Sequence, residues 1–155
     1  MANIFVLDSD TLKIKSFKCI DTAFSNDDFK IEHKSVWNSV RFNVFRDTNK
    51  GCDICNINGP YETKPHFHEG GEHRLFLRGQ GMFYIPMNKE LYCVECFAGD
   101  LIWLRPRLLH WFTTYGNMSA ARFFLDSVDH TEMYDDIPLE IFELKEKIGQ
   151  FNITI

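Results

Sequence analysis

Histidine and glutamate side chains gather in one short stretch of this 155-residue chain, from His66 to Glu72. His66 and His68 stand two positions apart, and residues with this spacing on a β-strand project to the same face. The segment 69–71 contains two glycines, which let the backbone bend and return Glu72 to that face. Two imidazoles and a carboxylate suit a divalent first-row metal ion such as iron, nickel or manganese. The spacing therefore predicts a metal site.

A fourth ligand is expected from a different strand. His110 fits, because it begins a predicted strand after the turn at residues 105–107. The alternative is that the histidines are ordinary surface or core residues and that Glu72 is a solvated carboxylate. A His-x-His pair alone does not decide between these readings, so the prediction depends on the complete spacing.

The complete spacing reproduces the signature of a known superfamily. His66-x-His68-x3-Glu72-x6-Gly79 resembles the first motif of the cupins, and Gly99-x10-His110 resembles the second motif in length. Residues 66–124 look most like the acireductone dioxygenases, which are metal-dependent enzymes of methionine salvage, whereas the preceding part is not matched. The stretches that carry this resemblance are His66-Phe-His68, Glu72-His-Arg74-Leu-Phe76, Gly79-Gln-Gly81, Gly99-Asp-Leu-Ile102, His110-Trp-Phe112 and Ala121-Arg-Phe-Phe124.

The resemblance implies a ligand set and a cofactor. In that family the His-x-His pair, the glutamate and the later histidine bind Fe(II) or Ni(II), and the same donors accept manganese, cobalt or zinc. The resemblance therefore assigns one divalent ion to His66, His68, Glu72 and His110.

Strand alternation extends the prediction beyond the ligands. Arg74 and Phe76 lie two and four positions after Glu72, so both should face the barrel interior. Phe112 lies two positions after His110 and should do the same. Aromatic walls of this kind exclude water and can seat an apolar part of a ligand.

The resemblance adds Arg122 and Phe124 to the interior face. In the family, arginines at the positions of Arg74 and Arg122 line the substrate pocket, together with a phenylalanine at that of Phe112. An inward arginine is costly without an anion. Either Glu72 pairs with Arg74 as a structural contact, or both arginines hold an enolate or carboxylate substrate beside the metal. The expected catalytic residues are Arg74 and Arg122, and the expected substrate-binding residues are Phe76, Phe112 and Phe124.

The activity implied by the resemblance is dioxygenation of a small anionic enediol or keto acid with O2. Two other functions are compatible with the same residues. One is a different metal-dependent cupin enzyme, such as a thiol or flavonoid dioxygenase or an isomerase, although two inward arginines favour a small anion over a flat phenol. The other is a non-enzymatic cupin that binds a small ligand.

The five cysteines allow a second metal site to be considered. Cys52-x-x-Cys55 and Cys93-x-x-Cys96 could suggest structural zinc. The 37 residues from 56 to 92 exceed ordinary zinc-ribbon spacing, and both pairs lie in strand-like sequence where i and i+3 face opposite sides. Plain reduced thiols are the favoured interpretation, and zinc stays the alternative. His33, His73 and His130 are expected to be structural or surface residues, and Glu69 a solvated loop carboxylate.

Short strands separated by turns must position these residues. Turn-rich clusters interrupt apolar or alternating segments throughout residues 64–125, which predicts an all-β jelly-roll barrel, or cupin, with a core at about 36–125. A strand is expected at 40–44, and another at 151–155. Acidic residues and Pro138 before an amphipathic segment, with Gly149 after it, predict a short C-terminal helix at about 137–148. We expect one domain over residues 1–155.

Composition limits the partners. A formal net charge of −5 and the lack of a basic stretch argue against a nucleic-acid partner. The segment 1–8 has no basic residues before its apolar run, and no apolar stretch is long enough to span a membrane. A cytoplasmic protein is therefore expected, and the resemblance implies a small anionic substrate and O2 as its partners. Cupins often dimerise through strands, so a homodimer is also an expected arrangement.

Overall fold

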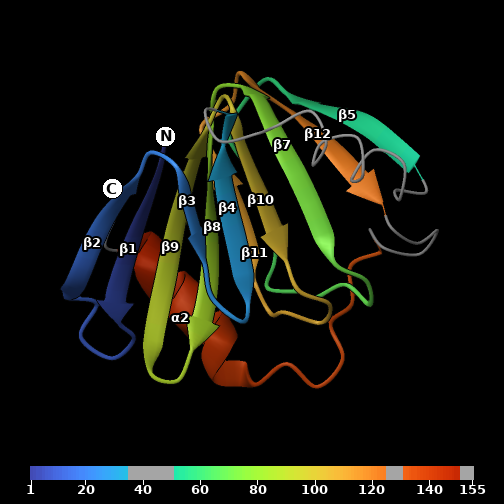
Figure 1. Cartoon of the computed structure of the whole chain (residues 1–155). Helices are drawn as coiled ribbons and strands as arrows, with labels where there is room; N and C mark the ends of the chain where they lie inside the picture. The colour runs from blue at the N-terminus through green and yellow to red at the C-terminus, as the bar shows by residue number, and fades with distance from the viewer. Residues whose placement is uncertain (35–50, 125–130, 151–155) are drawn as a thin grey trace.

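The computed structural model describes residues 1–34, 51–124 and 131–150, which form two antiparallel β-sheets and a helix (Figure 1). The first sheet has the strand order β2-β1-β9-β8-β11-β6, and the second has the order β3-β4-β10-β7-β12-β5. The strands of the first sheet are β1 (Ala2–Asp8), β2 (Ile14–Ile20), β6 (Tyr61–Glu62), β8 (Gln80–Met87), β9 (Glu90–Phe97) and β11 (Trp111–Thr114). Those of the second are β3 (Ala23–Ser25), β4 (Phe29–His33), β5 (Gly51–Ile57), β7 (Glu72–Arg78), β10 (Asp100–Leu104) and β12 (Met118–Phe124). The expected all-β class with a C-terminal helix is confirmed.

Local sequence explains the hairpins that join these strands. Asn88 and Lys89, at φ 45° and 65°, make the two-residue turn between β8 and β9, as the right-handed twist of a hairpin favours. Gly79 turns the chain from β7 into β8 at φ 78°, and a Cβ there would lie 2.5 Å from the carbonyl oxygen of Asn117. Only glycine fits such a position without displacing the backbone of the neighbouring loop.

The core lies between the two sheets. Inward-facing side chains alternate with outward-facing ones along each strand, so both sheets contribute apolar groups to one layer. The fully buried members include Phe83, Ile85, Val94 and Cys96 from the first sheet and Phe29, Ile31, Phe76 and Ile102 from the second. This packing fixes the strands on which the site is built.

Helix α2 (Leu139–Gln150) covers the outer face of the first sheet. Leu144 and Ile148 are its buried residues, and they pack with Tyr84, Trp111 and other residues of β1, β8, β9 and β11. The predicted end at residue 148 was too early, because the helix continues through Gly149. Gly149 lies in open space, since a Cβ added there would meet no atom within 4 Å. An exposed glycine destabilises a helix by only about 1 kcal/mol, so the helix can continue through it.

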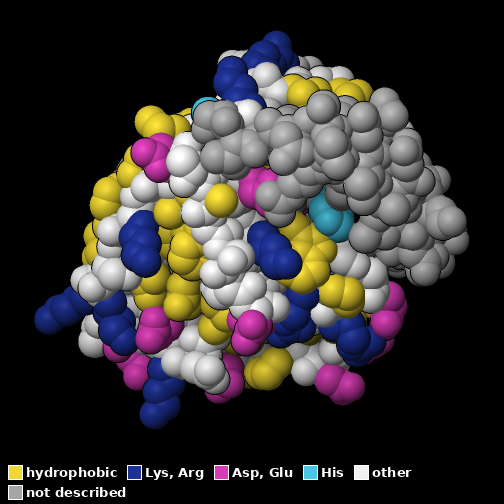
Figure 2. Space-filling model, in the orientation of Figure 1, with side chains coloured by type: hydrophobic (Ala, Val, Ile, Leu, Met, Phe, Trp, Pro, Cys, Tyr) yellow, Lys and Arg dark blue, Asp and Glu magenta, His cyan; other side chains and the backbone are white. Residues whose placement is uncertain are grey.

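The N-terminal segment widens both sheets. The β1–β2 hairpin pairs with β9, and the β3–β4 hairpin pairs with β10. The strands expected at 40–44 and 151–155 lie outside the described residues. None of the described helical residues forms a segment that could span a lipid bilayer. On the face shown in Figure 2, basic and acidic side chains of the described residues are interspersed rather than gathered into one patch.

Candidate metal centre

The segment that carries the first two histidines is not the regular strand that the spacing predicted. His66 instead forms an isolated bridge with His110, with backbone hydrogen bonds of 2.9 and 3.0 Å, and Phe67 forms another with Met133. His66 and His68 bond to the segment 107–110, whereas Phe67 between them bonds to Met133 on the opposite edge. The backbone is therefore locally extended, and the side chains of His66 and His68 share one side of it. A loop held by two isolated bridges therefore places both histidines on one side, as a regular strand would have done.

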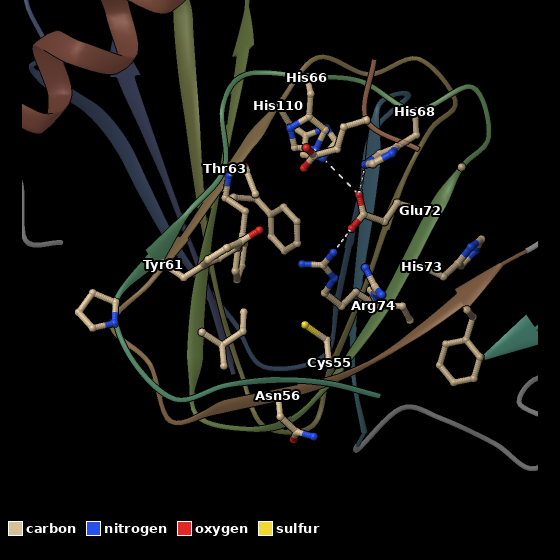
Figure 3. A pocket seen from close by; sticks show the side chains of 18 of the residues that line it. Cys55, Asn56, Tyr61, Thr63, His66, His68, Glu72, His73, Arg74 and His110 are labelled. Carbon is tan, nitrogen blue, oxygen red and sulfur yellow. Dashed lines mark hydrogen bonds and ion pairs between the residues drawn. The ribbon is translucent and has the colours of Figure 1, made fainter. Parts of the chain in front are cut away.

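Three imidazoles meet inside the mouth of the barrel (Figure 3). His66, His68 and His110 are all buried, at 3%, 8% and 2% exposure, and their ligand atoms lie within 4.8 Å of one another. His110 immediately precedes β11, so the first sheet fixes its position. Among the residues that the structure describes, this is the group of potential ligands with the spacing that a metal ion needs.

Each imidazole is oriented by a backbone carbonyl oxygen. In all three rings Nδ1 lies within hydrogen-bond distance of a carbonyl, which can only accept, so Nδ1 carries the proton and Nε2 presents a lone pair. These contacts join His66 to Lys64 at 2.6 Å, His68 to Thr131 at 3.1 Å and His110 to Leu108 at 2.8 Å. Metal-binding histidines are commonly fixed in this way.

Glu72, the first residue of β7, completes the group of donor atoms. Its Oε2 lies 3.3 Å from Nε2 of His68 and 3.2 Å from Nε2 of His110, and it has no hydrogen-bond partner. Two ligand atoms at about 2.1 Å from one ion and at right angles lie about 3 Å apart. The buried, unpartnered oxygen and the converging lone pairs therefore fit a cation.

The pKa shifts describe the same electrostatics. Burial and the neighbouring His110 lower the pKa of His66 to about 4, so this ring is neutral at pH 7. Burial raises the pKa of Glu72, but the Arg74 guanidinium and the imidazoles of His110 and His68 lower it by more. The pKa of Glu72 therefore lies well below its usual value. Burial lowers the pKa of His68, yet contact with the Glu72 carboxylate raises it overall. The shifts at Glu72 and His68 both arise from the negative charge of the Glu72 carboxylate and the positive groups around it.

Arg74 lies beside this group, on β7. Its Nη2 is 2.5 Å from Oε1 of Glu72, so the ion pair considered as the structural alternative is present. The guanidinium also lies 5.5 Å from the ring centre of Phe83 and 5.2 Å from that of Phe112. Its Nε is buried and has no hydrogen-bond partner. Phe76 is 1% exposed and packs against both phenylalanines, so the rings form a wall behind Arg74.

Arg122 also lines the pocket but is held differently. Strand register places it between Arg74 on β7 and Asp53 on β5. Its Nε and Nη2 donate to the two carboxylate oxygens of Asp53 at 2.8 and 2.7 Å, a two-pronged contact that raises the pKa of Arg122. Phe124 is the last residue of β12, and its side chain lies outside the described residues.

The site contains residues that sequence reasoning missed. Phe83 pairs directly with Phe112 across β8 and β11, and the alternation of β8 could have indicated it. Asp53 and Glu132 give no such signal, because neither has a spacing relationship to the ligands. Glu132 Oε1 lies 3.7 Å from Nε2 of His66. The pocket has a volume of about 810 Å³, and Tyr61 and other residues of the segment 55–63 also line it (Figure 3).

The remaining histidines and Glu69 lie in different surroundings. His73 lines the pocket, and burial lowers its pKa to about 4. Glu69 is exposed but ion-paired with Arg107. His33 ends β4, and residue 130 lies outside the described part.

The cysteines are dispersed over both sheets. Cys52 and Cys55 lie on β5 in the second sheet, whereas Cys93 and Cys96 are buried on β9 in the first. All four are free thiols, and burial raises the pKa of Cys93 to about 12. Because the pairs are on different sheets, they do not combine into one four-cysteine site.

Comparison with known proteins yields one family and a consistent set of relatives. The ARD/ARD′ family model matches residues 24–132, which extends the likeness upstream of residue 66. Acireductone dioxygenase of Saccharopolyspora erythraea is 40% identical over 63 residues, covering 39% of this chain and 33% of the relative. That of Aquifex aeolicus is 45% identical over 49 residues, covering 32% and 27%. The matched segments thus span a third or less of these relatives' length.

A solved structure resembles the fold. Acireductone dioxygenase from Bacillus anthracis, solved with a cadmium ion in its active center, matches with a TM-score of 0.51 and 22% identity. The match covers 64% of this chain and 65% of that one. The likeness concerns the fold alone, and it agrees with the predicted jelly-roll barrel.

Proposed function

We propose, because this chain belongs to the ARD/ARD′ family, that it is a metal-dependent dioxygenase. One divalent first-row ion, Fe(II) or Ni(II), would be held by His66, His68, Glu72 and His110. The observation that carries this proposal is the buried Oε2 of Glu72, which lacks a hydrogen-bond partner and faces two imidazole nitrogens at 3.2 and 3.3 Å. Arg74 already pairs with Oε1, so Oε2 is the carboxylate oxygen left to bind an ion together with the imidazoles.

The substrate that we propose is a small anionic enediol or keto acid, of which an acireductone is the example, with O2 as the second substrate. Arg74 supports this choice. Its Nη2 is held by Glu72, and its buried Nε–H has no hydrogen-bond partner and could donate to an anionic oxygen of a substrate. The ion, when bound, would supply Lewis acidity and positions at which a substrate can chelate through two oxygens.

The chain's own residues have separable tasks in this proposal. Arg74 would stabilise negative charge that develops on the substrate, in a pocket where a preorganised donor is worth several kcal/mol. Phe83 and Phe112 hold its guanidinium and exclude water. Arg122 would contribute positive potential, while Asp53 fixes its position and neutralises part of its charge.

The family and the five cysteines suggest the cellular setting. An acireductone substrate would place the reaction in methionine salvage. We propose a cytoplasmic location, which the described cysteines fit because they form no disulfide and reduced thiols are the rule in that compartment.

The test is anaerobic addition of an acireductone to Fe(II)- or Ni(II)-loaded protein, followed by oxygen. Substrate absorbance, oxygen uptake and product acids are measured, with a flavonol and a simple thiol as comparison substrates. Consumption of acireductone and O2 in equal amounts supports the proposal. Metal-loaded protein that binds acireductone without oxygen uptake would instead be a binding protein, and uptake with only a comparison substrate would assign a different cupin enzyme.

A matched control separates enzymatic from metal-catalysed oxidation. His110→Ala protein, incubated with the same total metal, should lose the activity because one of four ligands is missing. Equal rates in this variant would show that free ion causes the oxidation.

A further inference from the structure

Residues 131–134 lie beside the loop that carries His66 and His68. The carbonyl oxygen of Thr131 accepts a hydrogen bond from Nδ1 of His68 at 3.1 Å. Met133 exchanges two backbone hydrogen bonds with Phe67, at 2.8 and 3.0 Å. Glu132 stands between these two attachments, so its backbone is tied directly to the loop that carries two of the histidines.

The two carboxylate oxygens of Glu132 have different neighbours. Oε2 accepts a hydrogen bond from the Tyr134 hydroxyl at 2.6 Å. Oε1 lies 3.7 Å from Nε2 of His66, which is too long for a hydrogen bond. Nδ1 of His66 already donates to the carbonyl of Lys64, so Nε2 offers a lone pair and not a proton. Two electron-rich atoms therefore face each other across a gap that a cation would fill.

The size of this gap is that of two ligands on one ion. With bonds of about 2.1 Å, two ligand atoms lie about 3 Å apart at right angles and about 4.2 Å apart on opposite sides. The Glu72–His110 separation of 3.2 Å and the Glu132–His66 separation of 3.7 Å both fall in this range. Glu132 meets this distance criterion at one imidazole, His66, whereas Glu72 meets it at two, His68 and His110.

We propose that Glu132 is a fifth protein ligand of the metal ion and that a chelating substrate displaces it. The inference rests on the metal centre of the proposed function. Five protein ligands leave one position of an octahedral ion open, whereas a substrate that binds through two oxygens needs two. Glu132 is the carboxylate suited to leave, since its side chain is 37% exposed against 12% for Glu72, and Tyr134 continues to hold its second oxygen.

The proposal can be tested with Mn(II), whose bound waters are counted by proton relaxation of the solvent. Metal affinity is measured in parallel by competition with a chelator. Glu132→Gln and Glu132→Ala should each gain one exchangeable water and should weaken Mn(II) binding about 10-fold to 100-fold. Glu146→Gln, which removes an exposed glutamate of α2, is the matched control and should leave both quantities unchanged.

The outcomes distinguish failure of the fifth ligand from failure of the proposed metal centre. An unchanged water count in both Glu132 variants overturns the fifth ligand, even if affinity falls, because loss of charge alone weakens binding without opening a position. Wild-type protein that binds no Mn(II), Fe(II) or Ni(II) overturns the metal centre itself. A gained water with normal Mn(II) binding in the wild type and in the Glu146 variant supports the fifth ligand, whatever the substrate assay shows.

Discussion

Replacing Arg74 with alanine tests the electrostatic reasoning about the pocket in two ways. The Arg74–Glu72 pair is largely buried, at 14% and 12% side-chain exposure, and Nη2 lies 2.5 Å from Oε1. Removing one partner of a buried pair costs roughly 3–5 kcal/mol, because the remaining charge has no compensation. We expect the lower end, about 3 kcal/mol, in metal-free protein, since neither side chain is fully buried.

This free energy of unfolding translates into a measurable melting temperature. In a chain of this length about 1 kcal/mol shifts Tm by about 2–4 °C, so metal-free Arg74→Ala should melt about 6–12 °C below the wild type. A bound divalent ion supplies the missing positive charge beside Glu72. Saturating Ni(II) should therefore raise the Tm of the variant by more than it raises that of the wild type.

The effect on turnover has a different origin. With metal content normal, Arg74→Ala should lower kcat by about 10²–10³-fold, which is the usual loss for one donor to a developing oxyanion. Arg74→Lys should recover only part, because an ammonium cannot reproduce a planar two-pronged contact. Arg78→Ala changes an exposed arginine of the same strand and is the control for both measurements.

Two results would refute the reasoning. Arg74→Ala protein with a wild-type Tm in the absence of metal would show that the ion pair does not stabilise the fold. Metal-replete Arg74→Ala that retains kcat within about threefold of the wild type would show that Arg74 does not meet the developing charge. Calorimetry and steady-state oxygen uptake make the two tests independent.

Three further predictions concern the ligands, the thiols and the aromatic wall. His110→Ala should lower Ni(II) affinity at least about tenfold in chelator competition while circular dichroism stays unchanged, because it removes one histidine ligand and no core strand. Cys52→Ser combined with Cys55→Ser should leave the metal content by elemental analysis unchanged, and the loss of one zinc equivalent would overturn the assignment of plain thiols. Gly81→Ala would place a Cβ 2.4 Å from the Phe112 ring, so it should destabilise the fold by about 1–3 kcal/mol in denaturant titration.

Much of the fold could be predicted because its signals are local. The turns that separate β7 to β12 contain glycine, asparagine or proline at the positions where the chain reverses, and the strands between them alternate. The helix was placed within a few residues for the same reason. Its predicted end, before Gly149, was two residues too early. The packing of Leu144 and Ile148 on the first sheet decides how far the helix continues.

The ligands were also within reach of the sequence. His66, His68 and Glu72 lie within seven residues of one another, so backbone alternation and a glycine-containing bend bring them to one side. Even so, the local conformation differed from the prediction, because His66 and Phe67 pair with two distant segments and not within a regular strand.

The order of the motifs along the chain is enough to identify the chemical groups of the site: three imidazoles, a carboxylate and two arginines. The distribution of their charges, in contrast, depends on contacts between segments that are distant along the chain. Arg122 meets Asp53 because β5 and β12 pair in register, and Glu132 approaches His66 because residues 131–133 attach to the ligand loop. Neither contact follows from spacing, since the partners are separated by more than sixty residues and the free energy that brings them together comes from packing and pairing of the whole barrel.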